Sequence, residues 1–243
     1  MNTTPSIILV HPQLAENVGM AARAMMNCNL YDLRLVAPRE NHLSAKAVSA
    51  SSGAEEILQQ AKIYASVPEA IADLQQVFAT TARHRHQTKT VYTAEKAASE
   101  MASGLLQGQK CGLMFGPERT GLENDDVSFC DAIINIPLNP KHCSLNLSQA
   151  VLLVGYEFYK QQIDAPAEQF ITNDTVIADK QKLQHFYEFL EKELDNCHSF
   201  SIDEKRPRML RNLRNIFSRN RLTEQELNTL YGIINYLKQP RKK

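Results

Sequence analysis

The sequence predicts an α/β fold, in which a parallel sheet is covered by helices, followed by a small all-helical extension. Three observations support this class. Short apolar runs alternate with helical patterns over residues 1–160. Two of these runs, Cys111–Phe115 and Ala132–Ile136, end directly in loops rich in Gly, Pro and Asn, as strands of open α/β sheets do. Beyond residue 175, only helical periodicity remains.

Six apolar runs are expected to form strands. They are Ser6–Val10, Leu33–Val36, Ile63–Ala65, Val77–Thr81, Cys111–Phe115 and Ala132–Ile136. Helices are expected over Val18–Cys28, Ser44–Gln60 with an interruption at Ser49–Gly53, Pro68–Leu74 and Thr93–Leu106. Short strand–helix–strand units favour parallel pairing through right-handed crossovers. We therefore expect a doubly wound parallel sheet.

The composition is that of an ordinary globular protein with more than one domain. The chain has 243 residues, 43% hydrophobic content and zero formal net charge. It contains no run of about eighteen apolar residues and no basic-then-apolar amino terminus, so we expect a cytoplasmic protein without a membrane span or signal peptide. Five scattered cysteines without a C-x-x-C pair argue against a disulfide framework or a zinc site and favour buried or half-buried free thiols.

Two loops are expected to lie at the carboxyl edge of the sheet, where open α/β sheets bind ligands. The first is Gly116–Gly121, and the second runs from Pro137 to Ser144, which can cap a helix. Their free backbone groups and few charges suit a neutral, adenosine-like ligand better than a polyphosphate. A Walker loop fits poorly, because Leu122 and Glu123 follow the second glycine in place of Lys and Ser/Thr. Two ordinary strand-to-helix connections are equally compatible with the spacing.

The predicted helix that follows Pro137–Ser144 has a single apolar face. That face consists of Leu147, Val151, Val154 and Phe158.

Three further features allow a functional and a structural interpretation. Arg23 falls near the border of the packed face of the first helix, as a surface arginine would. Asn17 would by default cap that helix. The stretch Ala82–His86 follows a strand at the same sheet edge, and it forms either a phosphate-contacting rim or a solvated loop. Its two arginines disfavour a metal ion beside the histidines, so we expect no metal.

The carboxyl-terminal part is predicted to be a separate helical bundle. Residues 1–160 would form the α/β domain, 161–175 a polar linker and 176–243 a basic helical extension. The predicted helices are Ile177–Asp195, Arg206–Phe217 and Glu224–Leu237. Arg208, Arg211 and Arg214 are three residues apart and are expected to share a helix face. Such a face either binds nucleic acid or is merely solvated.

Three sequence blocks together resemble SPOUT-class (TrmH-like) RNA 2′-O-ribose methyltransferases. They are Asn17-Val18-Gly19-x-x-x-Arg23, then Phe115-Gly116-x-Glu118-x-x-Gly121-Leu122, then Ile136-Pro137 with Ser144-Leu145-Asn146-Leu147-Ser148. The variant block Asn139-Pro140-x-x-x-Ser144-Leu145-Asn146-Leu147 and the helical extension are similar to the TrmJ group, the tRNA (cytidine/uridine-2′-O-)-methyltransferases that modify position 32 of the anticodon loop. The resemblance covers nearly the whole chain. Cys143 departs from it, because serine is frequent there.

The resemblance implies a carboxyl-terminal trefoil knot in the α/β domain, S-adenosyl-L-methionine as cofactor, tRNA as substrate, and a homodimer. The implied cofactor contacts are Thr80, Thr81, Ala82, Gly116, Ile136, Cys143, Ser144 and Leu145. The implied RNA contacts are Arg83, Arg85, Arg208, Arg211 and Arg214. These assignments rest on the family and not on composition or spacing.

The resemblance also implies a catalytic set of five residues: Arg23, Asn17, Glu118, Ser144 and Asn146. Arg23 would approach the cofactor held by the partner subunit and stabilise the developing alkoxide, because an arginine is essentially never deprotonated. Asn17 would orient Arg23 or the ribose. Glu118 and Ser144 would hold the substrate, and Asn146 would brace the loop.

Two other functions fit the same motifs. One is 2′-O-methylation of ribosomal RNA, against which only the helical extension argues. The other is an RNA-binding protein without chemistry, against which the complete catalytic set argues. A base methyltransferase fits less well, because the Asn17/Arg23 block favours the ribose.

Overall fold

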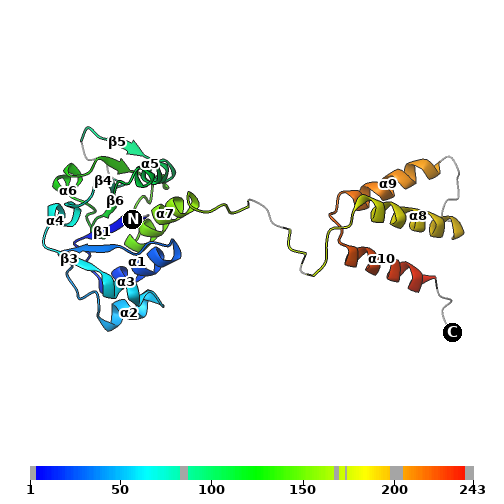
Figure 1. Ribbon diagram of the computed structural model, residues 1–243, viewed down its shortest axis with the longest axis horizontal. Coiled ribbons are helices and arrows are strands. Elements are labelled where there is room, and N and C mark those ends of the chain that lie inside the picture. The colour runs from blue at the N-terminus through cyan, green and yellow to red at the C-terminus, as the bar shows by residue number, and fades with distance from the viewer. Residues whose placement is uncertain (1–3, 83–86, 167–169, 173, 198–204, 239–243) are drawn as a thin grey trace. The chain divides into compact units, whose positions relative to one another are not determined.

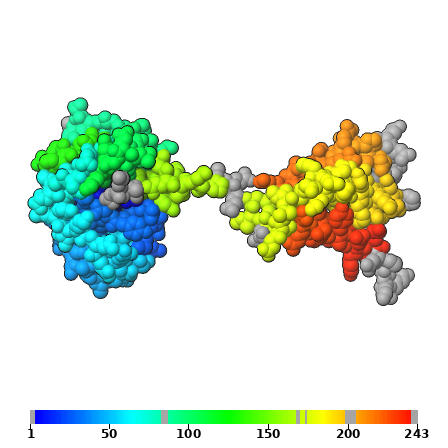
Figure 2. Space-filling view, viewed as in Figure 1, coloured from blue at the N-terminus to red at the C-terminus, as the bar shows by residue number. Residues whose placement is uncertain are grey.

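The computed structural model describes residues 4–82, 87–166, 170–172, 174–197 and 205–238. The chain divides into two compact units, residues 1–165 and 166–243. The first unit is a sheet covered by helices, and the second consists of helices (Figure 1). A space-filling view of each unit is given in Figure 2.

The first unit is built on a sheet whose strands are all parallel. The strands are β1 (Ser6–Val10), β2 (Leu33–Val36), β3 (Lys62–Tyr64), β4 (Gln76–Thr80), β5 (Thr90–Tyr92), β6 (Cys111–Phe115) and β7 (Ala132–Ile134). Their order is β3-β2-β1-β6-β4-β7-β5. The prediction of a parallel α/β sheet is confirmed. It missed β5, a three-residue edge strand, and extended β7 two residues too far.

Helices cover both faces of this sheet, so the central strands are buried along their whole length. One face carries Ile7 and Leu9 and packs against five helices. These are α1 (Ala15–Asn27), α2 (Ala45–Ser51), α3 (Glu55–Gln60), α5 (Ala94–Leu106) and α7 (Leu147–Lys160). The other face carries Ile8 and Val10 and packs against α4 (Val67–Ile71) and α6 (Asn124–Ser128).

In the first unit, two predicted helix starts are wrong. α1 begins at Ala15, three residues earlier than expected, and its N-cap Leu14 offers no side-chain bond. The backbone N–H of Ala15 instead donates to Glu40 Oε2 at 3.0 Å. Asn17 is therefore not a cap. It lies in the first turn of α1 and is buried.

The second wrong start is that of α7, whose cap is Asn146 rather than Ser144. Asn146 Oδ1 accepts from the Ser148 backbone N–H at 2.9 Å, and the Asn146 N–H donates to Gln149 Oε1 at 3.3 Å. The Asn146 side chain also accepts from the Gln149 backbone N–H, and its reciprocal bonds with Gln149 form a capping box. The predicted apolar face of α7 is confirmed, since all four of its residues are buried. They are Leu147, Val151, Val154 and Phe158.

The helical stretch after β2 breaks later than predicted. α2 continues through Ser51, and the chain then turns at Ser52 and Gly53, whose φ angles are 45° and 100°. α2 also packs very closely on α1, because a Cβ at Gly19 would lie 2.1 Å from the carbonyl oxygen of Ala47. Only glycine allows this approach.

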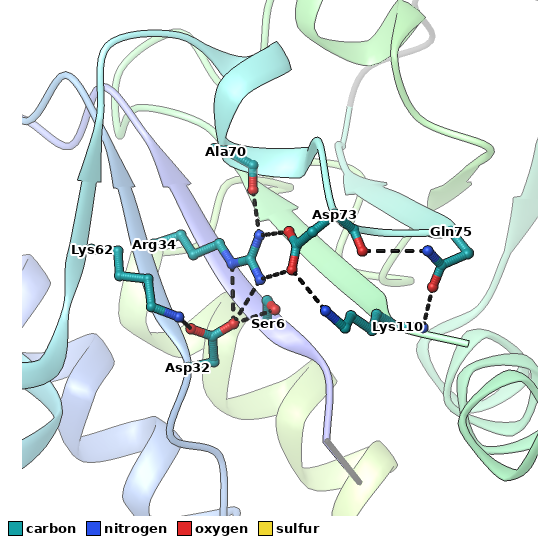
Figure 3. Close-up of polar contacts among 8 residues, drawn as sticks. All are labelled: Ser6, Asp32, Arg34, Lys62, Ala70, Asp73, Gln75 and Lys110. Carbon is teal, nitrogen blue, oxygen red and sulfur yellow. Dashed lines mark hydrogen bonds and ion pairs between the residues drawn. The ribbon is translucent and has the colours of Figure 1, made fainter. Parts of the chain in front are cut away.

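A charged network ties the amino edge of the sheet together (Figure 3). The buried Arg34 guanidinium donates to both carboxylate oxygens of Asp73, at 2.5 and 3.2 Å, and to Asp32 at 3.0 Å. Lys62 binds the other oxygen of Asp32, and Lys110 binds Asp73 Oδ2, which also accepts from Arg34. Hydrogen bonding to Arg34 lowers the pKa of Asp73 to about 2. The network joins β2, β3, β6 and the turn after α4.

The second unit is a three-helix bundle over its described residues. Its helices are α8 (Lys180–Asn196), α9 (Arg206–Ser218) and α10 (Glu224–Leu237). The predicted start of α8 at Ile177 is wrong by three residues, because Ile177 forms an antiparallel bridge with Thr223 and Asp179 caps the helix. Phe186 is fully buried at the centre, with Phe217 and Tyr231 edge-on to its ring at centroid distances of 5.0 and 5.4 Å. Such edge-to-face pairs stabilise a core beyond their buried area. The bundle thus has an aromatic core of its own.

The five cysteines are free. Cys28, Cys111 and Cys130 are buried as expected, whereas Cys143 and Cys197 are exposed. Among the described helices, none has the length and apolar character needed to cross a membrane.

Candidate active site

A pocket opens at the carboxyl edge of the sheet, beyond the ends of β4, β6 and β7. Its walls come from residues 80–82, the loop 116–121 and the loop 136–147. All eight residues predicted to contact a cofactor line it. They are Thr80, Thr81, Ala82, Gly116, Ile136, Cys143, Ser144 and Leu145. The structure therefore brings these residues together, while their contact with a cofactor stays a prediction.

The first loop folds tightly back on itself. A Cβ at Gly116 would lie 2.1 Å from the backbone nitrogen of Leu122, so this position admits no side chain. Gly121 has a φ of 66°, which glycine adopts without strain, and its N–H donates to the Pro117 carbonyl at 2.8 Å. The hydroxyl of Thr80 fixes the neighbouring wall by donating to the Met114 carbonyl at 2.9 Å.

Three predicted catalytic residues form a continuous polar chain beside the pocket. Asn17 Nδ2 donates to Glu118 Oε1 at 2.6 Å, and Asn146 Nδ2 donates to Asn17 Oδ1 at 3.0 Å. Burying the Asn17 amide is favourable because both of its ends are hydrogen-bonded. The chain ties α1, the loop after β6 and the start of α7 into one unit. Asn17 thus orients Glu118 and Asn146, and no described contact joins it to Arg23.

The sequence prediction missed two residues of the site. The backbone N–H of Gln13 donates to Glu118 Oε2 at 3.0 Å, so both carboxylate oxygens of Glu118 are held. Arg119 lines the pocket and is exposed. Its place between Glu118 and Gly121, within a predicted ligand loop, was a signal that could have identified it. Nothing in the sequence pattern marks a backbone donor such as that of Gln13.

Arg23 and Ser144 occupy different positions relative to the pocket. Ser144 lines it and is exposed. Arg23 is exposed on α1 and is not among the lining residues of its own chain; its Nη1 donates to Ser52 Oγ at 3.4 Å. Arg23 comes six residues after Asn17, which places the two about 120° apart around the helix. Within one chain, Arg23 therefore does not join the other predicted catalytic residues.

The predicted RNA contacts have three outcomes. Arg83 and Arg85 lie outside the described residues. Arg208 and Arg211 are exposed on α9. Arg214 pairs with Glu191 of α8 at 2.6 Å. The expectation of one shared face is wrong for Arg214, because six residues separate it from Arg208, which corresponds to about 120° around the helix.

The donor set of the pocket suits an uncharged aromatic or sugar ligand. Apolar walls such as Phe115, Ile136 and Leu138 lie beside backbone groups and hydroxyls, with Glu118 as the carboxylate at its edge. Among the described residues, no group of three or more His, Cys, Asp and Glu side chains is arranged to hold a metal ion.

Comparison with known protein families identifies the class. The pattern of the SpoU rRNA Methylase family matches residues 5–156, which include all residues that line the pocket. The chain belongs to the SpoU methylase family. A second pattern, that of the tRNA methyltransferase TrmJ C-terminal domain, matches residues 181–243. The resemblance to the SPOUT class and to the TrmJ group is confirmed.

Two relatives of this SpoU-family chain resemble it over nearly its full length, and a third shares its fold over part of the chain. TrmJ from Z. mobilis ZM4 has a crystal structure with a TM-score of 0.85 and 43% identity, covering 97% of this chain and 100% of that one. The tRNA (cytidine/uridine-2′-O-)-methyltransferase TrmJ of Yersinia pestis (strain Pestoides F) is 33% identical, covering 97% and 92% of the two chains. The SpoU methyltransferase AviRb from Streptomyces viridochromogenes, solved with AdoMet, shares the fold, with a TM-score of 0.53 and 19% identity over 68% and 60% of the chains.

Proposed function

We propose that this protein transfers a methyl group from S-adenosyl-L-methionine to the ribose 2′-hydroxyl of a tRNA pyrimidine nucleotide, at position 32 of the anticodon loop. The observation that carries the proposal is that three distant sequence blocks meet at one place: Glu118 lines the pocket, and beside the pocket Asn17 holds both Glu118 and Asn146. The likeness to TrmJ proteins in both units supports tRNA as the substrate.

The pocket residues fit the cofactor chemically. Apolar walls and free backbone groups suit adenosine, and the sulfonium supplies an already activated methyl group, so that catalysis mainly requires placing the hydroxyl in line with it. When bound, the cofactor would supply its methyl group to the 2′-oxygen as the S–CH₃ bond broke, and the hydroxyl proton would leave to solvent. In our proposal, Glu118 and Ser144 hold the ribose side, while Asn17 and Asn146 keep Glu118 and the second loop in place.

We propose that Arg23 acts in a homodimer, on the substrate bound by the partner subunit. Its distance around α1 from Asn17 supports this, as does its exposure. The exposed Met20 of α1, together with Leu152, Leu153 and Tyr156 of α7, offers apolar surface for a partner. A guanidinium at that place would stabilise the developing alkoxide. The trefoil knot belongs to the same proposal, because the family ties its pocket loops in this way. A tRNA substrate would place this activity in the cytoplasm.

A second candidate substrate is ribosomal RNA, because the family that matches residues 5–156 is named for it. The second unit favours tRNA over ribosomal RNA, because its sequence matches a tRNA methyltransferase domain. Transfer of labelled methyl to unmodified tRNA and to ribosomal RNA fragments distinguishes them. Digestion to nucleosides should give a 2′-O-methyl pyrimidine, and fragment mapping should place it at position 32. Label on ribosomal RNA alone would overturn the tRNA substrate, and label at position 34 would overturn the position.

Mixed dimers test the role of Arg23. We expect Arg23→Ala and Glu118→Gln each to lose transfer, while S-adenosylmethionine binding by Arg23→Ala stays near wild type in calorimetry. Refolding the two variants together at equal amounts should restore about a quarter of wild-type activity, because half of the dimers then contain one intact composite site. If the mixtures stay inactive, an active site composed of residues from both subunits is excluded. An Arg23→Ala protein with wild-type turnover would remove Arg23 from the mechanism altogether.

A further inference from the structure

The neighbouring strands β1 and β2 end in the same unusual turn. The residue after β1 is His11, with a φ of 46°, and the residue after β2 is Ala37, with a φ of 41°. Neither is a glycine, and each precedes a proline, which disfavours helical backbone in the residue before it. Such strain persists only where surrounding contacts impose it, and it occurs preferentially at functional sites.

Backbone hydrogen bonds connect these two turns. The His11 N–H donates to the Val36 carbonyl at 2.9 Å, and the Arg39 N–H donates to the Pro12 carbonyl at 3.1 Å. The backbone of Arg39 is therefore fixed against the loop that leads into α1. Because β1 and β2 are parallel, both loops lie at the carboxyl edge of the sheet, the edge that carries the pocket.

Gln13 connects Arg39 to the site. Its side-chain Oε1 accepts from Arg39 Nη1 at 3.4 Å, while its own backbone N–H donates to Glu118 Oε2 at 3.0 Å. The Gln13 Nε2 donates to the His11 carbonyl at 2.8 Å, which fixes the amide. One residue thus separates the Arg39 guanidinium from the Glu118 carboxylate.

The Arg39 charge is available to a ligand. Its side chain is exposed, and within the described part of the chain it forms no ion pair. The adjacent Glu40 carboxylate instead accepts from the backbone N–H of Ala15. By contrast, Arg34 of β2, the strand that precedes this loop, is bound to two carboxylates at the other edge of the sheet. An exposed guanidinium that carries no ion pair matches the geometry of a phosphate group.

We propose that Arg39 is an RNA-contacting residue, which binds a backbone phosphate next to the target nucleotide and so sets the register of the ribose over the pocket. Phosphate contacts position nucleic acid without reading its sequence. The proposal rests on the proposed function, since it needs RNA to approach this edge. It adds to the site a cation that lies outside the three family blocks.

The test compares Arg39→Ala and Arg39→Lys with Lys62→Ala in the full-length protein. Lys62 is the first residue of β3, so Lys62→Ala removes a positive charge from the opposite edge of the sheet. Equilibrium binding of unmodified tRNA is measured over a series of salt concentrations. We expect Arg39→Ala to weaken tRNA binding about 5- to 20-fold and to lower the salt slope by about one, with Arg39→Lys retaining the slope. S-adenosylmethionine binding should be unchanged, and Lys62→Ala should match wild type.

The proposal is overturned if Arg39→Ala binds tRNA like wild type with an unchanged salt slope. It is also overturned if S-adenosylmethionine binding weakens instead, because the guanidinium would then serve the cofactor. Because binding is measured independently of turnover, a wild-type protein that binds tRNA but transfers no methyl would refute the proposed function, and the binding comparison would still decide the role of Arg39. With active wild type, KM for tRNA should rise in Arg39→Ala far more than kcat falls.

Discussion

The Asn17 side chain serves two partners that lie far apart in the sequence. Glu118 is 101 residues away and Asn146 is 129 residues away, and the two bonds use the opposite ends of one amide. An amide is suited to this position because it donates and accepts at once. A carboxylate of the same shape could only accept, and it would face the carboxylate of Glu118.

Substituting Asn17→Asp should therefore make transfer strongly pH-dependent. Two carboxylates at this separation do not both ionise easily, so the pKa of the pair rises, and one shared proton restores the bond. We expect the rate relative to wild type to fall at least 10-fold near pH 8.5 and to recover partly near pH 6. Initial rates across this range measure it. Asn17→Ala, which has no proton to share, should be impaired equally at all pH values, and a wild-type profile for Asn17→Asp would exclude this account.

At this scale, the sequence was informative about which residues gather but not about what each one contacts. The family blocks led to Gly116, Cys143 and Ser144, and these do line one pocket. The blocks could not show that Asn17 is buried rather than a cap, because its partners come from distant loops. A backbone donor such as Gln13 leaves no trace in residue type.

At the scale of elements, sequence propensity located the central strands correctly but mispredicted an edge strand and the starts of helices. β5 was missed because its three residues are exposed or half-buried and carry no apolar pattern. The start of α1 was misplaced because its first N–H groups are satisfied partly by Glu40, a tertiary contact, instead of a local cap. The start of α7 was misplaced by two residues because Ser144 and Asn146 are both good caps, and only Asn146 is followed by a glutamine at the capping-box position.

The α9 helix allows a matched test of RNA binding. Arg208 and Arg211 are exposed, whereas Arg214 is bound to Glu191. We expect Arg208→Ala/Arg211→Ala to weaken tRNA binding and to lower its salt slope by about two, since each free arginine can neutralise one phosphate. Arg214→Ala is the control and should leave the slope nearly unchanged. If the double variant binds tRNA like wild type, α9 serves another contact, such as the partner subunit.

At the scale of the whole molecule, the two units have separate cores and should respond separately to acid. The pKa of Asp73 is lowered to about 2 by its bonds to Arg34, so this carboxylate stabilises the first unit above its unfolded pKa, and the contribution disappears as the pH falls from about 4 to about 2. Because Asp73 is half exposed, we expect about 1 kcal/mol.

Hydrogen exchange resolved by segment measures this effect. In wild type, protection of β2 and β6 should decline over that pH range more than protection of α8–α10. Asp73→Asn should be less stable at neutral pH and should lose less of its remaining stability on acidification. If the stability of wild type and of Asp73→Asn falls in parallel with pH, the Arg34–Asp73 pair does not contribute to the acid sensitivity of the first unit.

The pairing of β1 with β6 has a consequence for how the protein is made. Ile7 pairs with Leu113 at the centre of the sheet, so β1 must wait until more than a hundred further residues are synthesised before it gains its second neighbour. Contacts so distant in sequence form slowly. Until then, β1 has apolar faces and an open edge, a species prone to aggregation during synthesis. Chaperone dependence is thus a foreseeable property of this nascent chain, and it originates in strand order rather than in any single residue.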